Sequence, residues 1–195
     1  MSPKTISTLK LIALLILGFA VFIFVAAFIV DTDFSAERSV IIDRSDQEIF
    51  EYVRFLENQY NYSVWGEMDP DMEREFHGTD GTVGFVSSWE GNEEVGRGEQ
   101  EIVGIVEGER IDYELRFYEP FESSAESYMI VEPVTENQTR VRWGFSGSMP
   151  RPMNLMLLFM NMDELIGSDF ETGLNNLKQI LESTETETET ETETN

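Results

Sequence analysis

The pattern of apolar and polar positions divides the chain into three regions. Residues 11–30, LIALLILGFAVFIFVAAFIV, carry no charge over a length that crosses a hydrocarbon layer of ~30 Å as a helix rising ~1.5 Å per residue. Because lipid offers no partner for backbone polar groups, this segment is predicted to be a transmembrane helix. Residues 32–182 form one domain. Residues 183–195 alternate Thr and Glu without an apolar side chain, which predicts a disordered tail.

The charges around the apolar helix predict its orientation. Lys4 and Lys10 precede it, whereas only aspartates follow closely. The positive side of a span stays in the cytoplasm, so we expect residues 1–10 there, a single pass through the cell membrane, and the domain on the extracytoplasmic side. The alternative is a cleaved signal peptide, since residues 25–27 (VAA) resemble a cleavage site; the apolar run is longer than the usual h-region, which favours a retained anchor.

The domain begins with a strand and a short helix. Residues 36–42 alternate as a strand does, and Ser45 with Glu48 fits a capping box. Apolar residues at helical spacing then predict a helix that ends near Leu56. Residues 58–65 are aromatic and irregular, with room for one more helical turn.

Six further strands follow, because the apolar period changes to two. We expect them at residues 72–77, 83–90, 98–106, 110–118, 123–131 and 139–146. Short polar or glycine-bearing turns separate them, as in an antiparallel meander. Tyr113 and Phe117 share a face with apolar neighbours, and charged residues occupy the opposite face, so one side of the sheet is predicted to be wet and the other aromatic.

The last element is predicted to be a long helix. Pro150 and Pro152 end the final strand, and the apolar run 155–162 opens the element. The apolar residues that continue it at steps of three and four are Ile166, Phe170, Leu174, Leu177 and Leu181. This stripe predicts a helix that ends near Glu182 and lies on the aromatic face of the sheet.

This order of elements resembles the START-like (helix-grip) superfamily, in its polyketide-cyclase-like (SRPBCC) branch. The resemblance covers roughly residues 34–182 and is carried by FSAERSVIIDRSDQEIFEYV, WGEMDPDMEREFHGTDGTVGFVSSWEGNEEVGRGEQEIV, RVRWGFSGSM and GSDFETGLNNLKQILES. It implies an α+β fold in which a curved antiparallel sheet of about seven strands, in the order β-α-α-β6-α, wraps a long C-terminal helix. The transmembrane helix precedes this domain.

Such folds leave a cavity between sheet and helix, so the resemblance implies a hydrophobic small molecule or lipid as partner. The residues expected to line the cavity are Trp65, Phe85, Trp89, Tyr113, Phe117, Trp143, Ile166, Phe170 and Leu174. Tyr113 would supply a hydroxyl, and Arg97 or Arg116 a charge near the mouth. For each residue the alternative is plain core packing. Gly96, Gly98 and Gly104 would let the sheet bend.

Composition excludes several classes of function. The chain has 38 acidic and 13 basic residues and a net charge of −25, which disfavours nucleic acid and anionic lipid surfaces as partners. Cysteine is absent, so there is no thiol nucleophile or thiolate metal site. The acidic runs 69–71 and 90–94 lack the spacing of a calcium loop, and no metal or cofactor is expected.

Three classes of function stay open. The favoured one is a binding module that requires no chemistry. The second is an enzyme resembling aromatase/cyclases, for which His77, the single histidine, with Glu75 is the only candidate catalytic pair. The third is a domain that binds a protein partner, which the sequence does not name.

Overall fold

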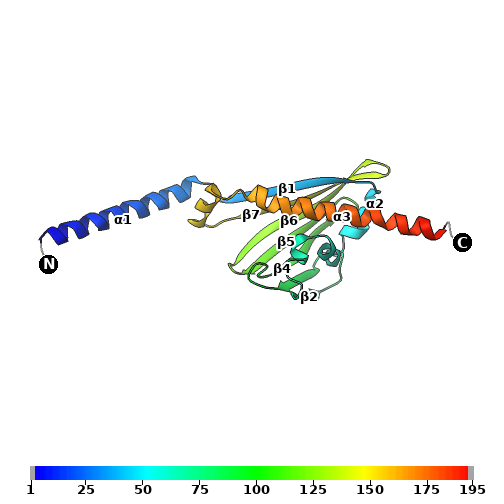
Figure 1. The fold of residues 1–195 in the computed structure, drawn as a ribbon, viewed down its shortest axis with the longest axis horizontal. Helices are drawn as coiled ribbons and strands as arrows, with labels where there is room; N and C mark the ends of the chain where they lie inside the picture. The colour runs from blue at the N-terminus through cyan, green and yellow to red at the C-terminus, as the bar shows by residue number, and fades with distance from the viewer. Residues whose placement is uncertain (1–2, 193–195) are drawn as a thin grey trace. The chain divides into compact units, whose positions relative to one another are not determined.

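The computed structural model describes residues 3–192, which fall into two compact units (Figure 1). One unit contains the N-terminal segment to Phe34 together with Ser148–Asn161. The other contains Ser35–Gly147 and the chain from Met162 onward.

The first unit is built on helix α1 (Pro3–Ile29), of which Lys10–Ile29 is long and apolar enough to span a membrane. The short 3-10 helix η3 (Met153–Leu158) packs on its last turn. Asn154 Nδ2 donates to the carbonyl oxygens of Ala27 at 2.8 Å and Val30 at 2.9 Å. Residues 155–158 of the apolar run therefore belong to η3, and only Met162 belongs to the long helix, so the expectation that the whole run opens that helix was wrong.

The second unit contains a seven-stranded antiparallel sheet in the order β1-β7-β6-β5-β4-β3-β2, which confirms the predicted fold class. The strands are β1 (Asp33–Ile42), β2 (Glu73–His77), β3 (Val86–Glu90), β4 (Arg97–Val106), β5 (Arg110–Glu119), β6 (Ser123–Thr135) and β7 (Gln138–Ser148). Strand β3 begins later than predicted because Thr82 to Phe85 form a turn, in which Gly84 has a φ of +91° that favours glycine.

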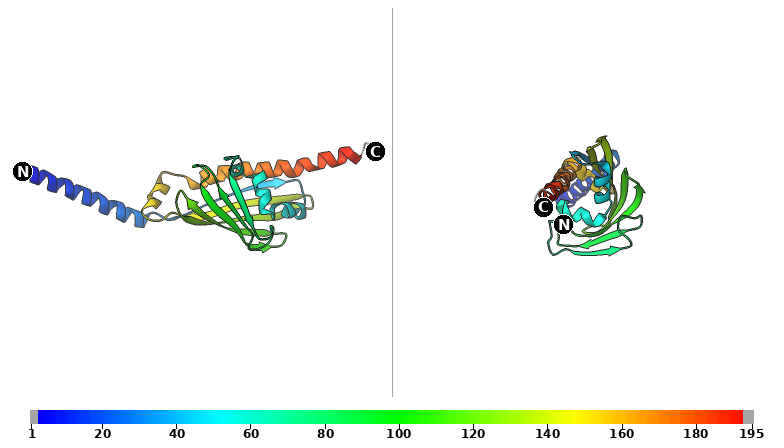
Figure 2. Two further views of the ribbon diagram at one scale, coloured as in Figure 1. Left: turned by 90° about the horizontal axis from the view of Figure 1, so that it is seen from below. Right: turned by 90° about the vertical axis from the view of Figure 1, so that its right-hand side faces the viewer.

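The short helix predicted after the first strand of the domain is α2 (Asp46–Val53), and its capping box is present. It ends before Leu56, since the carboxylate of Asp80 accepts from the Leu56 amide at 2.8 Å and the Glu57 amide at 3.0 Å. These bonds start a separate 3-10 helix, η1 (Leu56–Asn61), and η2 (Val64–Gly66) follows. Together they lie against the same face of the sheet as the C-terminal helix (Figure 2).

Helix α3 (Met162–Thr192) lies along the concave face of the curved sheet (Figure 2). Strand β1 and the residue after it hold the helix between Asp163 and Glu182. Arg38 pairs with Asp163 at 2.9 Å, Lys178 Nζ donates to the Ile41 carbonyl at 2.7 Å, and the Asp43 amide donates to Glu182 at 2.8 Å. The helix continues beyond Glu182, because extending an existing helix is easier than starting one. The disorder expected for 183–195 stays a prediction, and 193–195 lie outside the described residues.

Candidate ligand-binding site

An aromatic cluster joins α3 to the middle of the sheet. The Trp143 ring of β7 stacks on Phe170 of α3, with centroids 4.5 Å apart and planes 19° from parallel. Tyr62 and Trp65 meet the Trp143 ring edge-on at 5.6 and 6.1 Å. Trp143 and Phe170 are each only 2% exposed, so their ring faces are occupied by protein. Trp143 and Phe170, which were predicted to line a cavity, are therefore part of the hydrophobic core.

A second aromatic pair lies toward the other edge of the sheet, where Trp89 of β3 meets Phe117 of β5 at 5.9 Å. Gly98 of β4 lies beneath the Trp89 ring: a Cβ there would be 2.6 Å from that ring and 2.6 Å from the Arg116 carbonyl oxygen. The glycine is therefore required by the close approach of a ring. Trp89 and Phe117 are only partly buried, unlike Trp143.

The other residues predicted to line a cavity are likewise either fully buried or only partly buried. Phe85 and Leu174 are 2% and 1% exposed and belong to the core. Trp65 and Ile166 are partly buried. Leu115 and Phe145, which the prediction omitted, are partly buried on the same face. The concave face thus has a fully packed part around Trp143 and a part whose side chains are less completely covered.

Two buried phenols lie between η1 and the sheet. Tyr113 of β5 and Tyr62 at the end of η1 are each 2% exposed, and burial raises the pKa of both hydroxyls well above the usual 10, so both stay protonated. The hydrogen bonds of residues 3–192 include none from either hydroxyl, and neither oxygen is among the fully buried polar atoms that lack a partner, so protein does not completely cover these two oxygens. Sequence reasoning found Tyr113 but missed Tyr62, whose irregular surroundings give no periodic signal.

Buried hydroxyls elsewhere on this face do have partners. Ser127 Oγ donates to the Gly144 carbonyl at 2.8 Å, and the hydroxyls of Tyr60 and Ser87 bond each other at 2.8 Å. Tyr62 and Tyr113 differ from these groups because their rings are buried while their hydroxyls donate to no described residue. A molecule with an oxygen acceptor would satisfy them.

The candidate catalytic pair lies on β2, the edge strand. His77 Nε2 is 3.8 Å from the Glu75 carboxylate, but the two side chains are 67% and 78% exposed. A general base of the predicted kind needs a buried, positioned partner. Within the described part of the chain, no group of three or more metal-ligating side chains could hold an ion.

His77→Ala is expected to change the free energy of unfolding by less than about 0.5 kcal/mol, because the side chain is exposed. It is also expected to leave the binding of apolar molecules unchanged. Denaturant titration and a binding assay on the full chain measure both. A large loss of binding would restore the cyclase-like alternative.

The two arginines expected at the mouth, Arg97 and Arg116, both pair with carboxylates. Arg116 is on the outer face of β5, where Glu99 at 2.5 Å, Glu101 at 2.6 Å and Glu114 at 2.5 Å surround it. The alternation along a strand explains this, since Leu115 and Phe117 occupy the concave face. Arg97 is exposed and pairs with Glu119 at 3.3 Å.

Arg116→Met is expected to lower the free energy of unfolding at pH 7 by on the order of 1–3 kcal/mol, because three clustered carboxylates lose their common partner. Burial raises the pKa of Glu99, but its hydrogen bonds to Arg116 and Tyr118 and the nearby charge of Arg116 together outweigh this and leave the pKa below the usual 4.5. The paired carboxylate therefore contributes stability above pH 4.5 that is lost as the pH falls through the lowered value. The difference between wild type and variant should shrink over that range; a pH-independent difference would contradict this origin.

Comparison with known proteins identifies the fold. No family model and no curated protein matches the chain. Among solved structures, norcoclaurine synthase from Thalictrum flavum is 8% identical with a TM-score of 0.56, over 78% of this chain and 95% of that one. XoxI from Bacillus cereus is 15% identical with a TM-score of 0.55, over 77% and 97%. A Thermobifida fusca protein is 20% identical with a TM-score of 0.51, over 74% and 91%.

These neighbours confirm the resemblance to START-like proteins at the level of fold. The chain has the helix-grip fold of the Bet v 1-like and SRPBCC proteins, with an apolar helix before it. At such low identities the likeness extends to the fold alone.

Proposed function

We propose that this protein is a membrane-tethered binding module. Its sheet and α3 hold an apolar small molecule or lipid that carries at least one oxygen acceptor. Binding requires no chemical step in this account. The observation that carries the proposal is the pair Tyr62 and Tyr113, whose rings are buried on the concave side while their hydroxyls are incompletely covered and have no partner among residues 3–192.

The partly buried apolar side chains of the concave side supply the rest of the proposed site. Trp65, Trp89, Phe117 and Ile166 are partly buried on the concave side, so further burial by a ligand is available to them. Removing apolar surface from water stabilises a complex by about 25 cal/mol per Å2. Trp143, Phe170 and Leu174 then act as the packed floor behind the ligand, and Phe85 as part of the same core.

The tether is α1, in a single pass through the cell membrane with residues 1–10 in the cytoplasm and the domain outside. Two features support retention of α1 over signal-peptide cleavage. Its apolar stretch, Lys10–Ile29, is long enough to span a bilayer. Ala27, at the possible cleavage site, is 1% exposed and bonded through its carbonyl to Arg151 and Asn154, as expected for a permanent part of the protein.

Removing both free hydroxyls tests this function. The double variant Tyr62→Phe with Tyr113→Phe keeps both rings and deletes only the two hydroxyl donors. We expect its free energy of unfolding to stay about the same, since neither hydroxyl gives up a hydrogen bond to the protein. Its affinity for a neutral brominated monoglyceride, followed by quenching of tryptophan fluorescence in the full chain, should fall on the order of tenfold because two hydrogen bonds are lost.

Tyr60→Phe is the matched control. Its hydroxyl has a protein partner in Ser87, so it should lose about 1 kcal/mol of stability while binding the monoglyceride as the wild type does. If the double variant instead loses stability and binds normally, the two hydroxyls have structural roles and the proposed site is wrong.

A further inference from the structure

The segment between β7 and α3 exposes more apolar side chains than its neighbours in sequence. Five residues in a row of eight carry this surface: Met153 is 39% exposed, Met156 47%, Leu158 61%, Phe159 89% and Met160 38%. Although the chain is strongly acidic, no acidic residue lies between Glu136 and Asp163. Large adjoining apolar side chains left in the open mark an interaction surface.

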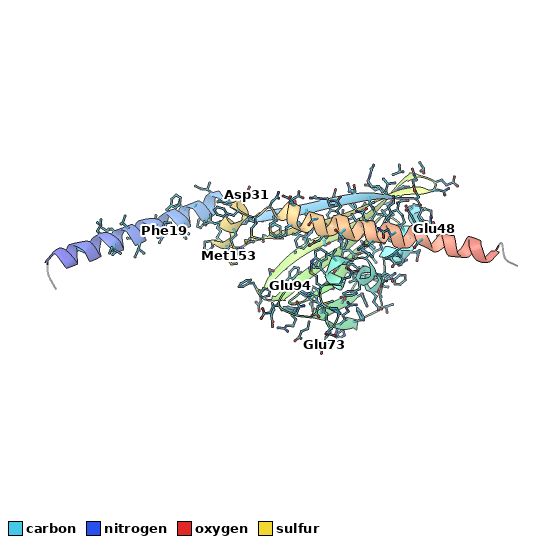
Figure 3. The ribbon with its side chains drawn as sticks, viewed as in Figure 1. Phe19, Asp31, Glu48, Glu73, Glu94 and Met153 are labelled. Carbon is cyan, nitrogen blue, oxygen red and sulfur yellow. The ribbon has the colours of Figure 1, made fainter. Side chains whose placement is uncertain are left out.

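This surface is fixed to the end of α1. Beside the two bonds from Asn154, Arg151 Nε donates to the Ala27 carbonyl at 2.9 Å, and the Arg151 guanidinium lies 5.1 Å from the centre of the Phe28 ring. Asn154 and Ala27 are 0% and 1% exposed. Figure 3 shows Met153 near Asp31, just beyond the last turn of α1.

The bonds from Arg151 and Asn154 also supply hydrogen-bond donors to carbonyl groups at the end of α1. The last carbonyls of a helix have no partner within it, and in lipid such groups are costly. Asn154 and Arg151 satisfy the carbonyls of Ala27 and Val30, and the positive charge of Arg151 suits the negative end of the helix. With these carbonyl groups hydrogen-bonded, the end of α1 and the segment bonded to it can lie at a depth in the bilayer where little water is present.

We propose that residues 153–160 lie in the interfacial layer of the same bilayer that α1 crosses, with their apolar side chains against lipid. The inference rests on the proposed membrane anchor and adds a second, peripheral contact. Lipid is the occupant favoured by continuity with α1: a segment bonded to the last turn of the span lies at the depth where the span leaves the hydrocarbon. Arg151, the only charge of the segment, suits lipid phosphates.

The absence of cysteine permits a direct test, because each single-cysteine variant of the full chain takes one label. We would label Phe159→Cys with the environment-sensitive dye NBD and reconstitute the chain in phosphatidylcholine vesicles with brominated acyl chains. Phe22→Cys, in the middle of α1, and Phe121→Cys, 69% exposed after β5, are the controls. The expected result is blue-shifted emission and bromine quenching at 159, as at 22, with a water-like spectrum at 121.

The controls separate the two proposals. Quenching at 22 without quenching at 159 overturns the interfacial segment and leaves the anchor intact. A blue shift at 159 without bromine quenching means that protein covers the segment, for example a second copy of the chain, and also overturns it. An unquenched label at 22 overturns the anchor itself.

Discussion

Trp143→Ala is expected to lower the free energy of unfolding of the second unit by about 3–5 kcal/mol. Trp143 is the residue on which β7, η1, η2 and α3 converge: its ring stacks on Phe170 and meets Tyr62 and Trp65 edge-on. Its truncation removes a large buried apolar surface and leaves a space that the surrounding strands cannot close.

Circular dichroism of the full chain in mild detergent, followed against denaturant, measures this loss. Phe121→Ala is the control; since Phe121 is 69% exposed, a change within about 0.5 kcal/mol is expected. A loss below 1 kcal/mol for Trp143→Ala would mean that the helix is not packed on this ring.

Gly98→Ala is expected to lower the free energy of unfolding by about 1–3 kcal/mol through overpacking. The new Cβ would lie 2.6 Å from the Arg116 carbonyl oxygen, which the β4–β5 ladder holds in place. It would also lie 2.6 Å from the Trp89 ring, so that ring must leave its place beside Phe117. The emission of Trp89 should therefore shift to the red as the ring becomes more exposed.

Gly104→Ala, on the same strand, is the matched control. Its nearest contact is the Asp112 carboxylate at 3.2 Å, the end of a partly exposed side chain that can shift by a few tenths of an ångström together with its partner Arg110, unlike a backbone carbonyl. Similar stability losses for the two variants would assign the effect of Gly98→Ala to strand flexibility rather than to the ring above it.

Much of the fold is readable from local sequence patterns. The period-two segments are strands, the Ser45–Glu48 box starts a helix, and the stripe from Ile166 to Leu181 lies on α3. These features depend on residues a few positions apart, and they are the ones that a pattern encodes.

The differences arise where distant residues decide the structure. The carboxylate of Asp80 starts η1, and Asn154 binds α1 across more than a hundred residues of chain. For a related reason, the sequence predicted several of the aromatic residues that face the concave side but not which of them are fully buried. An aromatic residue on the concave face is either core or lining according to what covers it, so Trp143 and Trp89 look alike in sequence but differ in burial. Tyr62 has no periodic context that would place it in the interior.

Native mass spectrometry of the full chain, released from nanodiscs formed directly from its own membrane, tests the central claim most directly. Ala125→Phe is the comparison variant, because Ala125 lies beside Leu115 on the concave face and is 8% exposed. We expect one apolar, oxygen-bearing compound per folded wild-type chain and a strong loss of that compound when the phenylalanine takes its space. Wild-type chains without such a compound, or equal retention by both proteins, would contradict binding between the sheet and α3.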